Sequence, residues 1–501
     1  MQKISLSFWF TVAGISMIAC SRSPVSVYPD NPHYFYYKGK PLILITSDQH
    51  YGAVIDMDFD YAKYLNYLSA SGLNLTRLYP GAMFEPPDKY LPGNPLGPLP
   101  GRQLLPWAKS GETGANELLA ESGHPSYKYD LDRWNKEYFD RLKAYVELAS
   151  EKNIIVEVAF FNGMYHDCWP LMPMFYNNNI QNIGKYDVRE CGLFTSDDIR
   201  NQDVIRYQEA YIKKIATELN KFDNLIYDIC DEPSLQGLPG GGLIFLPDSQ
   251  VVPWISRMKD AFLEAELSLP KKHLLGQTVQ NLSPDFSGES WCEWLPTEYV
   301  KPAGKALILD YKCGKPLVDV ESNYYGMSLT ENVYNYDAVR LEGWWFMLGG
   351  GAGIINLNGE FHRGQETGGG STHSYIVPQR KILKDFMDSF ELSGLSRFAD
   401  FSGIPADGFC NVLAESGKQY ALYIFHGSYE SGWGAHFTPE HGNFRDTIAM
   451  NNIPAGKYLI RWIDPASGSV RKEEEVAWAG GKLMLETPVY NLDLAMSMKK
   501  H

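Results

Sequence analysis

The chain has 501 residues, of which 44% are hydrophobic, 14% aromatic and 21% charged, and its formal net charge is −15. The length predicts one large domain with a smaller one, and the composition is that of a folded globular protein rather than a disordered one. The acidic charge excludes a nucleic-acid partner, because phosphate binding needs a basic surface.

The N-terminus carries a short apolar segment behind a positive charge. Lys3 precedes an uncharged, mostly apolar run over 4–19, which is short for a transmembrane helix. The run ends in Ile-Ala-Cys-Ser and resembles a bacterial lipoprotein signal, in which Cys20 is lipidated. The alternatives are an ordinary signal peptide or a membrane anchor. We expect residues 1–20 to be a lipoprotein signal that holds the protein in the cell envelope, either in the periplasm or on the outer-membrane surface.

Strand-like and helix-like segments alternate from residue 33 to residue 398, which is typical of a parallel sheet built from βαβ units. The predicted strands are 41–47, 73–80, 154–162, 226–234, 273–281, a segment near 287–296, 315–323 and 352–361. The predicted helices are 58–72, 131–153, 204–222, 338–350 and 377–395. Eight repeats favour a (β/α)₈ TIM barrel with enlarged loops. A doubly wound sheet is the competitor, but no glycine-rich first turn supports it.

The pattern changes after residue 400. Short alternating segments separated by Gly, Pro and Asn turns predict an antiparallel β-sandwich over 400–498. Six cysteines follow the predicted signal without any CxxC pair, so a zinc site is not expected. Cys168 and Cys191 form the best-placed disulfide pair for an exported protein, and whether they are bonded stays open.

Two glutamates stand out at the ends of apolar strands. Catalytic residues of a barrel lie at the carboxyl ends of its strands. Glu232 follows the fourth predicted strand and Glu321 belongs to the seventh. Glycoside hydrolysis needs two carboxyl groups across a pocket, one to protonate the leaving oxygen and one to attack or support the anomeric carbon. The separation of the two groups decides between retention and inversion.

These glutamates, together with Arg77 in the stretch GLNLTRLYP, resemble the cellulase-like clan (clan A) of retaining glycoside hydrolases. The resemblance implies that Glu232 is the acid/base, Glu321 is the nucleophile and Arg77 hydrogen-bonds the nucleophile. One position departs from the clan, which usually has an asparagine before the acid/base to hold the substrate 2-hydroxyl. Asp231 stands there, and a carboxylate accepts hydrogen bonds but cannot donate as an amide does. Its charge would also raise the pKa of a nearby Glu232.

A closer resemblance, spread over most of the chain, is to apiosidase-like barrels of gut Bacteroidetes. The stretches that carry it are YKGKPLIL, QRKILKDFMDSF and YLIRWIDPASG. Such barrels carry a C-terminal sandwich of the collagen-binding type, for which we expect packing on the barrel and glycan contact rather than collagen binding.

Further polar and aromatic residues near strand ends are candidates for substrate binding. Flat aromatic rings with polar edges suit sugar stacking, although they also build cores. We expect Trp291 and Trp294 to stack on sugar rings, and Trp344 and Trp345 to lie in the core. The substrate-binding candidates are Arg77, Asp231, His50, Asn162, Asn323, Tyr324, Trp291 and Trp294.

Each of these residues also has a plain structural interpretation. Asp231 and Glu232 could open a helix, because acids favour helix N-termini, although the sequence that follows is a poor helix. Glu321 and Arg77 could belong to ordinary ion pairs. His166 and Asp167, Asp48, Tyr325, Asn356, Asn358 and Glu360 also lie near strand ends and could be loop or core residues.

The sequence therefore predicts a lipid-anchored retaining glycoside hydrolase with no cofactor and no metal. Its partner is a carbohydrate, a plant-type glycan or oligosaccharide that an exo-type enzyme would cleave. The alternative is a non-catalytic glycan-binding surface lipoprotein on a degenerate barrel. A barrel esterase is disfavoured because no GxSxG motif occurs.

Overall fold

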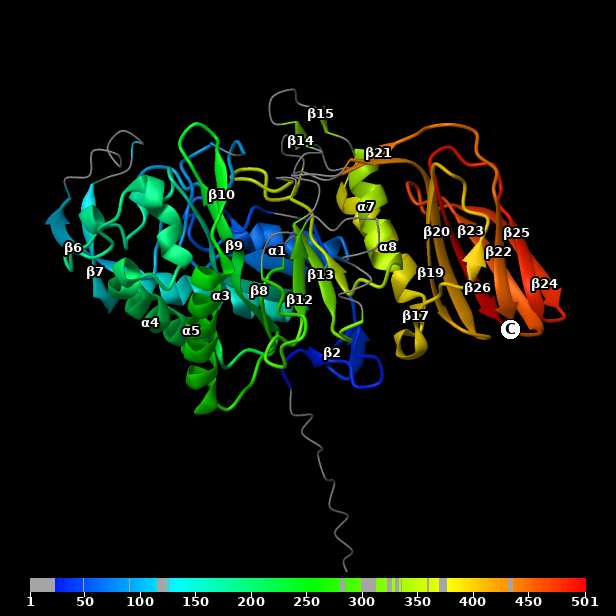
Figure 1. The fold of residues 1–501 in the computed structure, drawn as a ribbon, viewed down its shortest axis with the longest axis horizontal. Coiled ribbons are helices and arrows are strands. Elements are labelled where there is room, and N and C mark those ends of the chain that lie inside the picture. The colour runs from blue at the N-terminus through cyan, green and yellow to red at the C-terminus, as the bar shows by residue number, and fades with distance from the viewer. Residues whose placement is uncertain are drawn as a thin grey trace, which may run out of the picture.

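The structure is a computed structural model, and it describes residues 23–47, 49–89, 91–114, 123, 126–279, 284–298, 312–321, 327–328, 333–334, 336–357, 360–368, 376–430 and 436–501. The fold is mixed α/β, with helices around parallel strands in the N-terminal part and antiparallel sheets at the C-terminal end (Figure 1). Within the described ranges, no helix has the length and apolar character that crossing a membrane requires.

Eight parallel strands form the centre of the N-terminal part. They are β4 (Leu44–Ile45), β5 (Leu75–Leu78), β8 (Ile155–Tyr165), β9 (Leu225–Gly237), β11 (Leu275–Gly276), β12 (Leu295–Glu298), β13 (Leu317–Glu321) and β16 (Gly353–Ile354). The helices are α1 (Tyr61–Ala70), α3 (Lys136–Glu151), α4 (Gln202–Leu219), α5 (Asp248–Leu267), α7 (Tyr336–Leu348) and α8 (Ile376–Asp388). Because the strands run in one direction, their carboxyl ends collect on one side.

Hydrogen bonds connect the parallel strands into two sheets and then connect the sheets. One sheet contains β5, β8, β9 and β11, and the other contains β12, β13, β16 and β4. Parallel bridges from Gly276 to Trp294 and from Val279 to Thr297 join β11 to β12. On the other side Asn74 joins β5 to β4, because its side chain donates to Ile43 O at 2.8 Å and accepts from Ile45 N at 2.9 Å. The eight strands are thus linked in sequence order back to the first.

The helices bury one apolar face against the strands. Asp60 caps α1 by accepting from Lys63 N, and the helix buries Tyr64, Leu65 and Leu68 at helical spacing. α4 likewise buries nine residues along one side. The strands beneath are buried throughout, as expected for parallel strands that are covered by helices.

Smaller elements surround the parallel strands. A sheet of β1 (Ser26–Val27), β2 (Phe35–Tyr37) and β3 (Lys40–Leu42) precedes them, and β6 (Trp107–Thr113) pairs with β7 (Tyr127–Trp134). β10 (Leu243–Phe245) pairs antiparallel with the end of β9, and β14 (Met327–Ser328) pairs with β15 (Val333–Tyr334).

The predicted elements differ from the observed ones at several places. The helix predicted from residue 131 begins at Lys136, because residues up to Trp134 belong to β7 and Asn135 caps the helix. α5 has no predicted counterpart. The sixth strand begins only at Leu295, near the end of the segment in which it is expected. The alternation of strands and helices that predicts a mixed α/β fold is confirmed.

The C-terminal part consists of two antiparallel sheets that share a core. One sheet contains β17 (Ser396–Arg397), β19 (Gly408–Glu415), β20 (Gln419–Glu430), β21 (His436–Pro439), β23 (Gly456–Ile463), β24 (Val470–Trp478) and β26 (Asp493–Lys500). The other contains β18 (Phe401–Ser402), β22 (Thr447–Ile453) and β25 (Gly481–Glu486). Leu422, Ile460 and Met450 lie among the buried residues between them.

Helices α7 and α8 lie between the parallel strands and the C-terminal sheets (Figure 1). Trp344 on α7 stacks on Tyr423 of β20 with ring centroids 5.5 Å apart. Arg340 on the same helix forms a buried two-point ion pair with Asp493 of β26, at 2.9 and 3.0 Å. Trp344 and Trp345 are therefore core residues, as predicted, and they lie where the two parts of the chain meet.

Cys168 and Cys191 are both free, buried thiols. The Cys191 thiol donates to Met164 O at 3.1 Å. Burial raises the pKa of Cys191 to about 12 and holds the pKa of Cys168 well above its usual range, so both are inert thiols rather than reactive ones.

Candidate active site

A cavity of about 450 Å³ lies at the carboxyl ends of the parallel strands. Both predicted catalytic residues, Glu232 and Glu321, line it. His50, Asn162 and His166 line it as well. The sequence-predicted residues that the structure brings together at this cavity therefore come from β8, β9, β13 and the segment after β4. A cavity of this size with converging polar groups is suited to a small polar ligand.

Glu232 lies in a bulge of β9 that displaces its side chain toward the cavity. The pairing of β8 with β9 shifts register after Asn162 and Asp231 and resumes only at Met164 and Gln236. Glu232 lies in the skipped segment with φ +47°, a backbone conformation that is rare for residues other than glycine. Gly163 on β8 permits this, because a Cβ there would lie 2.4 Å from the Glu232 carbonyl oxygen. Such strain in a cavity wall is typical of a functional residue.

The Glu232 carboxyl group is buried and accepts a hydrogen bond from a tyrosine hydroxyl. Its residue is 5% exposed, and the Tyr165 hydroxyl donates to Glu232 Oε2 at 2.5 Å. β9 continues past Glu232 to Gly237 and pairs with β10. The alternative that Asp231 and Glu232 open a helix is therefore wrong.

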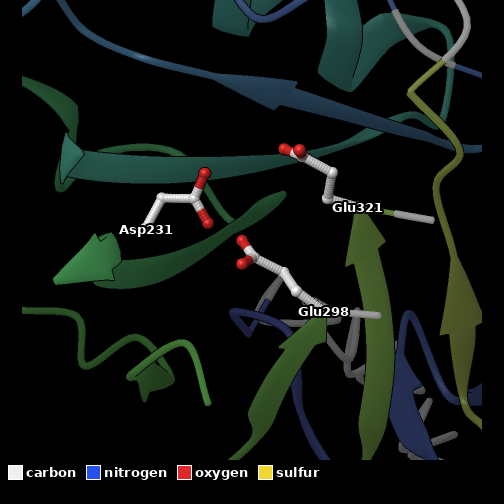
Figure 2. Close-up of side chains that lie close together, drawn as sticks. All are labelled: Asp231, Glu298 and Glu321. Carbon is white, nitrogen blue, oxygen red and sulfur yellow. The ribbon is translucent and has the colours of Figure 1, made fainter. Parts of the chain in front are cut away.

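Glu321 is the last residue of β13, and it is paired with Glu298 at the end of β12 after a one-residue shift in the register of the two strands. Figure 2 shows the side chains of Glu321, Glu298 and Asp231 pointing toward one another. Glu298 and Glu321 end β12 and β13, and Asp231 lies within β9. Carboxylate oxygens of the three residues lie within 4.8 Å of one another. Glu321 is 8% exposed and lines the cavity. Asp231 has no exposed surface and Glu298 is 2% exposed.

Beneath this cluster, Arg77 of β5 is buried among acids. Its guanidinium forms ion pairs with Glu157 at 2.9 Å, Asp228 at 3.2 Å and Asp231 at 3.0 Å, and lies 3.9 Å from Glu298. These are its ion pairs within the described part of the chain, and Glu321 is not among them. The guanidinium also lies over the rings of Tyr51 and Tyr79, at 5.0 and 5.6 Å. Arg77 is therefore the central cation of a buried acidic network.

The Asp231 and Glu298 carboxyl groups have pKa values that are shifted in opposite directions. Burial is the largest influence on Asp231 and raises its pKa, but the Arg77 charge and hydrogen bonds from Glu298, Tyr79 and Arg77 outweigh it, so the pKa of Asp231 lies below its ordinary value. Burial, the Asp231 charge and the hydrogen bond to Asp231 hold the pKa of Glu298 well above its usual range. Asp231 is therefore the ionised partner of the pair and Glu298 the protonated one.

The other two partners of Arg77 also hold protons at higher pH than usual. Burial raises the pKa of Glu157 to about 8 and that of Asp228 to about 6, in each case against the lowering effect of Arg77. Asp228 is further held by Thr278, whose backbone N–H donates at 2.9 Å.

These shifts predict a pH-dependent stability. Between its ordinary value of 4.5 and about 8, folded Glu157 keeps a proton that the unfolded chain releases. The free energy of unfolding should therefore fall as the pH rises through that window, by at most about 1.4 kcal/mol per pH unit for this residue. Urea titrations at pH 5, 6, 7 and 8 on the wild type and on Glu157→Gln measure it, because the variant lacks the ionisable group. An equal slope in both proteins would contradict the assignment to Glu157.

The three clustered carboxyl groups offer oxygen ligands of the kind that Ca²⁺ or Mg²⁺ takes. Two of the three groups, however, are already neutralised within the protein. Arg77 pairs with Asp231 at 3.0 Å, and burial together with the Asp231 charge raises the pKa of Glu298 well above its usual range. The residues therefore do not fit a cation site, and we assign none to this cluster.

The wall of the cavity opposite Glu321 is polar. The Tyr79 hydroxyl donates to Asp231 Oδ2 and accepts from Asn162 Nδ2 at 3.1 Å. His50 Nε2 lies 3.0 Å from Glu85 Oε2, and Asn94 Nδ2 also donates to that oxygen. These bonds fix the orientation of His50 and Asn162, so both present an ordered polar surface to a ligand.

Four predicted substrate contacts lie outside the cavity lining. Trp294 is fully buried, and its indole donates to Tyr227 O at 3.0 Å, so it cannot stack on a sugar. Trp291 packs against Phe286 and lies outside the cavity lining. Arg77 and Asp231 have side chains with no exposed surface and also lie outside the lining, so they lie beneath the cavity wall.

Some predicted residues contribute differently or fall outside the described ranges. Asn356 is buried, and its Oδ1 accepts from Arg380 Nε at 3.0 Å. Asp167 forms an ion pair with Lys89, a residue of the cavity wall. Residues with predicted roles that lie outside the described ranges are Cys20, Asp48, Asn323, Tyr324, Tyr325 and Asn358.

Sequence reasoning missed Glu298, Tyr165, Tyr79, Glu157 and Asp228. A signal for Glu157 and Asp228 is present, because Glu157 is the one acid of β8, Asp228 stands between apolar residues of β9, and a buried charge needs a partner. Arg77, in the stretch LTRL of β5, is the buried cation that pairs with both acids.

Comparisons with known proteins show likeness of fold only. No protein-family model matches the chain, and no curated protein matches it. A solved structure described as a glycoside hydrolase matches with a TM-score of 0.59 at 10% identity, covering 95% of this chain and 97% of that one. A glycoside hydrolase family 5 protein from Bacteroides vulgatus matches with a TM-score of 0.57 at 11% identity, covering 95% and 94% of the two chains. The overall fold is thus similar to that of glycoside hydrolases.

Proposed function

We propose that this chain is a retaining glycoside hydrolase of the clan A type, with a (β/α)₈ barrel and a C-terminal β-sandwich. The observation that carries the proposal is that Glu232 and Glu321 line one cavity from the carboxyl ends of two different parallel strands. A likeness of fold to glycoside hydrolases over nearly the whole chain supports it.

The two glutamates perform a double displacement in this proposal. Glu321 attacks the anomeric carbon, and the bond from that carbon to the leaving oxygen breaks as Glu232 gives that oxygen its proton. The product of this step is a glycosyl ester on Glu321. Glu232, now a carboxylate, then removes a proton from water, and the water oxygen displaces Glu321 from the anomeric carbon. Two inversions leave the configuration retained.

The surroundings of each glutamate suit its part. The Tyr165 hydroxyl bonds Glu232 Oε2 and fixes the orientation of the acid/base, which a proton donor needs. Glu321 ends β13 on a rigid strand and faces the cavity. The positive φ of Glu232 is a strain of the kind found at active sites and ligand clamps, so it supports a functional role for this residue.

The cavity suits a plant-type glycan or oligosaccharide that is cleaved from one end. Its walls supply hydrogen-bonding groups on His50, Asn162, Tyr79 and Lys89, which match sugar hydroxyls. The β9–β10 hairpin closes one side, because Leu238 and Leu243 line the cavity. We further propose the apiosidase-like type for the barrel and a lipid anchor on Cys20 that holds the enzyme in the cell envelope, in agreement with the sequence patterns.

A screen of plant and host glycans with the wild type and with Glu321→Ala tests the proposal. The wild type should release reducing sugar from at least one glycan, and Glu321→Ala should release none above background. Glu264→Ala is the matched control, because Glu264 is an exposed glutamate on α5 that pairs with Lys213 at the surface. Release that survives Glu321→Ala, or a wild type inactive on every glycan, would refute the proposal.

A further inference from the structure

The buried carboxyl groups of Asp231 and Glu298 have oxygens within 4.8 Å of one another. Two ionised carboxylates this close in the interior repel each other, and they cannot hydrogen-bond because neither has a hydrogen to donate. A proton on one of the two groups removes the repulsion and supplies the donor. Figure 2 shows the two groups facing one another with Glu321 beside them.

The other contacts of Asp231 decide which group carries the proton. Asp231 Oδ1 accepts from Arg77 at 3.0 Å, and Asp231 Oδ2 accepts from the Tyr79 hydroxyl. Asp231 is thus an acceptor toward both of these donors, as an ionised carboxylate is. Glu298 has the weaker link to the cation, since its Oε1 lies 3.9 Å from Arg77 Nη1. Glu298 is therefore the donor.

The charges around Glu298 favour the same arrangement. Asp231, Glu232 and the thiol of Cys230 come from β9, Glu321 comes from β13, and Arg77 from β5 is the cation that faces it. An ionised Glu298, which is 2% exposed, would add a further negative charge to the cluster of Asp231 and Glu321 with little water to screen it.

We propose that Glu298 is a positioning residue that is protonated in the working enzyme and that donates its carboxyl proton to Asp231, which fixes the buried cluster against which Glu321 stands. The expected effect on catalysis rests on the proposed function. The protonation of Glu298 does not depend on it. Glu298 does not line the cavity, so it acts through Asp231 and Glu321 rather than on the substrate.

In this role, the side-chain amide of a glutamine can substitute for the protonated carboxyl group of Glu298, and the methyl group of an alanine cannot. The glutamine of Glu298→Gln keeps the size and a hydrogen-bond donor, whereas Glu298→Ala leaves Asp231 without that donor. At neutral pH, kcat of Glu298→Gln should stay within about threefold of the wild type, and kcat of Glu298→Ala should fall by roughly 10²-fold, as for a misplaced catalytic group.

The pH profile distinguishes this role from a merely structural one. Ionisation of Glu298 at high pH breaks its bond to Asp231, so the wild type should lose activity on the basic side. Glu298→Gln has no proton to lose and should keep its activity at pH values where the wild type has lost it. Glu266→Gln removes another buried carboxyl group, on α5 away from the cavity, and should leave the basic limb as in the wild type.

An infrared measurement tests the proton independently of any activity. The difference spectrum of wild type minus Glu298→Gln at pH 7 should contain the carbonyl band of a protonated carboxylic acid. Absence of that band, or a Glu298→Gln profile with an unchanged basic limb, would overturn the proposal. If the band is present but the wild type is inactive on all glycans, the protonation of Glu298 stands and the glycosidase proposal falls instead.

Discussion

Replacing Glu232 by alanine is expected to remove proton transfer but to leave the nucleophile in place. Replacing Glu321 by alanine is expected to abolish hydrolysis, because no nucleophile remains. Glu232→Ala should lose roughly 10²–10⁴-fold in kcat on natural glycans, because the leaving oxygen departs without a proton. On an aryl glycoside of the same sugar with a strongly acidic phenol, the loss in the first step should nearly vanish, since that leaving group needs no proton. Glu321→Ala should be inactive on both substrates. Steady-state kinetics on the two substrates measures the difference.

Added azide identifies the two roles through stereochemistry. In Glu232→Ala, azide replaces water in the second step and should give a glycosyl azide of retained configuration. In Glu321→Ala, azide takes the place of the missing nucleophile and should give the inverted anomer. NMR of the product distinguishes the two anomers, and Glu264→Ala should form neither at a rate above the wild type. Retained product from Glu321→Ala would assign the nucleophile to another residue.

Replacing Arg77 by methionine is expected to destabilise the fold more than any change at the cavity surface. The guanidinium is the cation paired with Glu157, Asp228 and Asp231 in the interior. Removing one partner of a buried ion pair leaves uncompensated charge and costs about 3–5 kcal/mol. Arg102→Met is the control, because the ion pair of Arg102 with Asp58 is partly exposed and is screened by solvent.

The pH dependence of the Arg77→Met loss tests its electrostatic origin. Glu157 and Asp228 bind protons with pKa values of about 8 and about 6 even beside the guanidinium. Lowering the pH from 8 to 5 should therefore neutralise both acids and shrink the difference in unfolding free energy between wild type and Arg77→Met. Urea unfolding at the two pH values measures it. A difference that does not shrink would show that lost packing, rather than charge, causes the destabilisation.

The sequence predicts the positions of the two candidate catalytic glutamates well, for a physical reason. Glu232 and Glu321 each end an apolar run, and carboxyl ends of parallel strands collect on one side of the fold. Alternating apolar strands and amphipathic helices were sufficient to predict the mixed α/β fold and a shared cavity. The roles of the two residues stay predictions, because position alone does not define chemistry.

What the sequence does not reveal depends on strand boundaries and on contacts across strands. The segment around Trp294 mixes polar and apolar residues and contains Pro296, so β12 is placed too early and its terminal Glu298 is overlooked. The same error makes Trp294 a candidate sugar platform, although it is buried. The place of Asp231 beside Glu232 makes it look like a substrate contact. No sequence pattern shows that its carboxyl group instead contacts Arg77, Tyr79 and Glu298.

The strand that carries Glu232 also builds part of the cavity wall. β9 runs on to Gly237, and its hairpin with β10 brings Gly240, Gly241 and Leu243 to the cavity. At Gly240 and Gly241 a side chain would meet open space, so the hairpin tip could carry larger residues if its positive φ angles were kept or relaxed. The length and bulk of this tip can therefore vary without disturbing Glu232 or the Arg77 network. In the proposed enzyme, changes at this tip would therefore alter which chain lengths fit the cavity without changing Glu232 or Glu321.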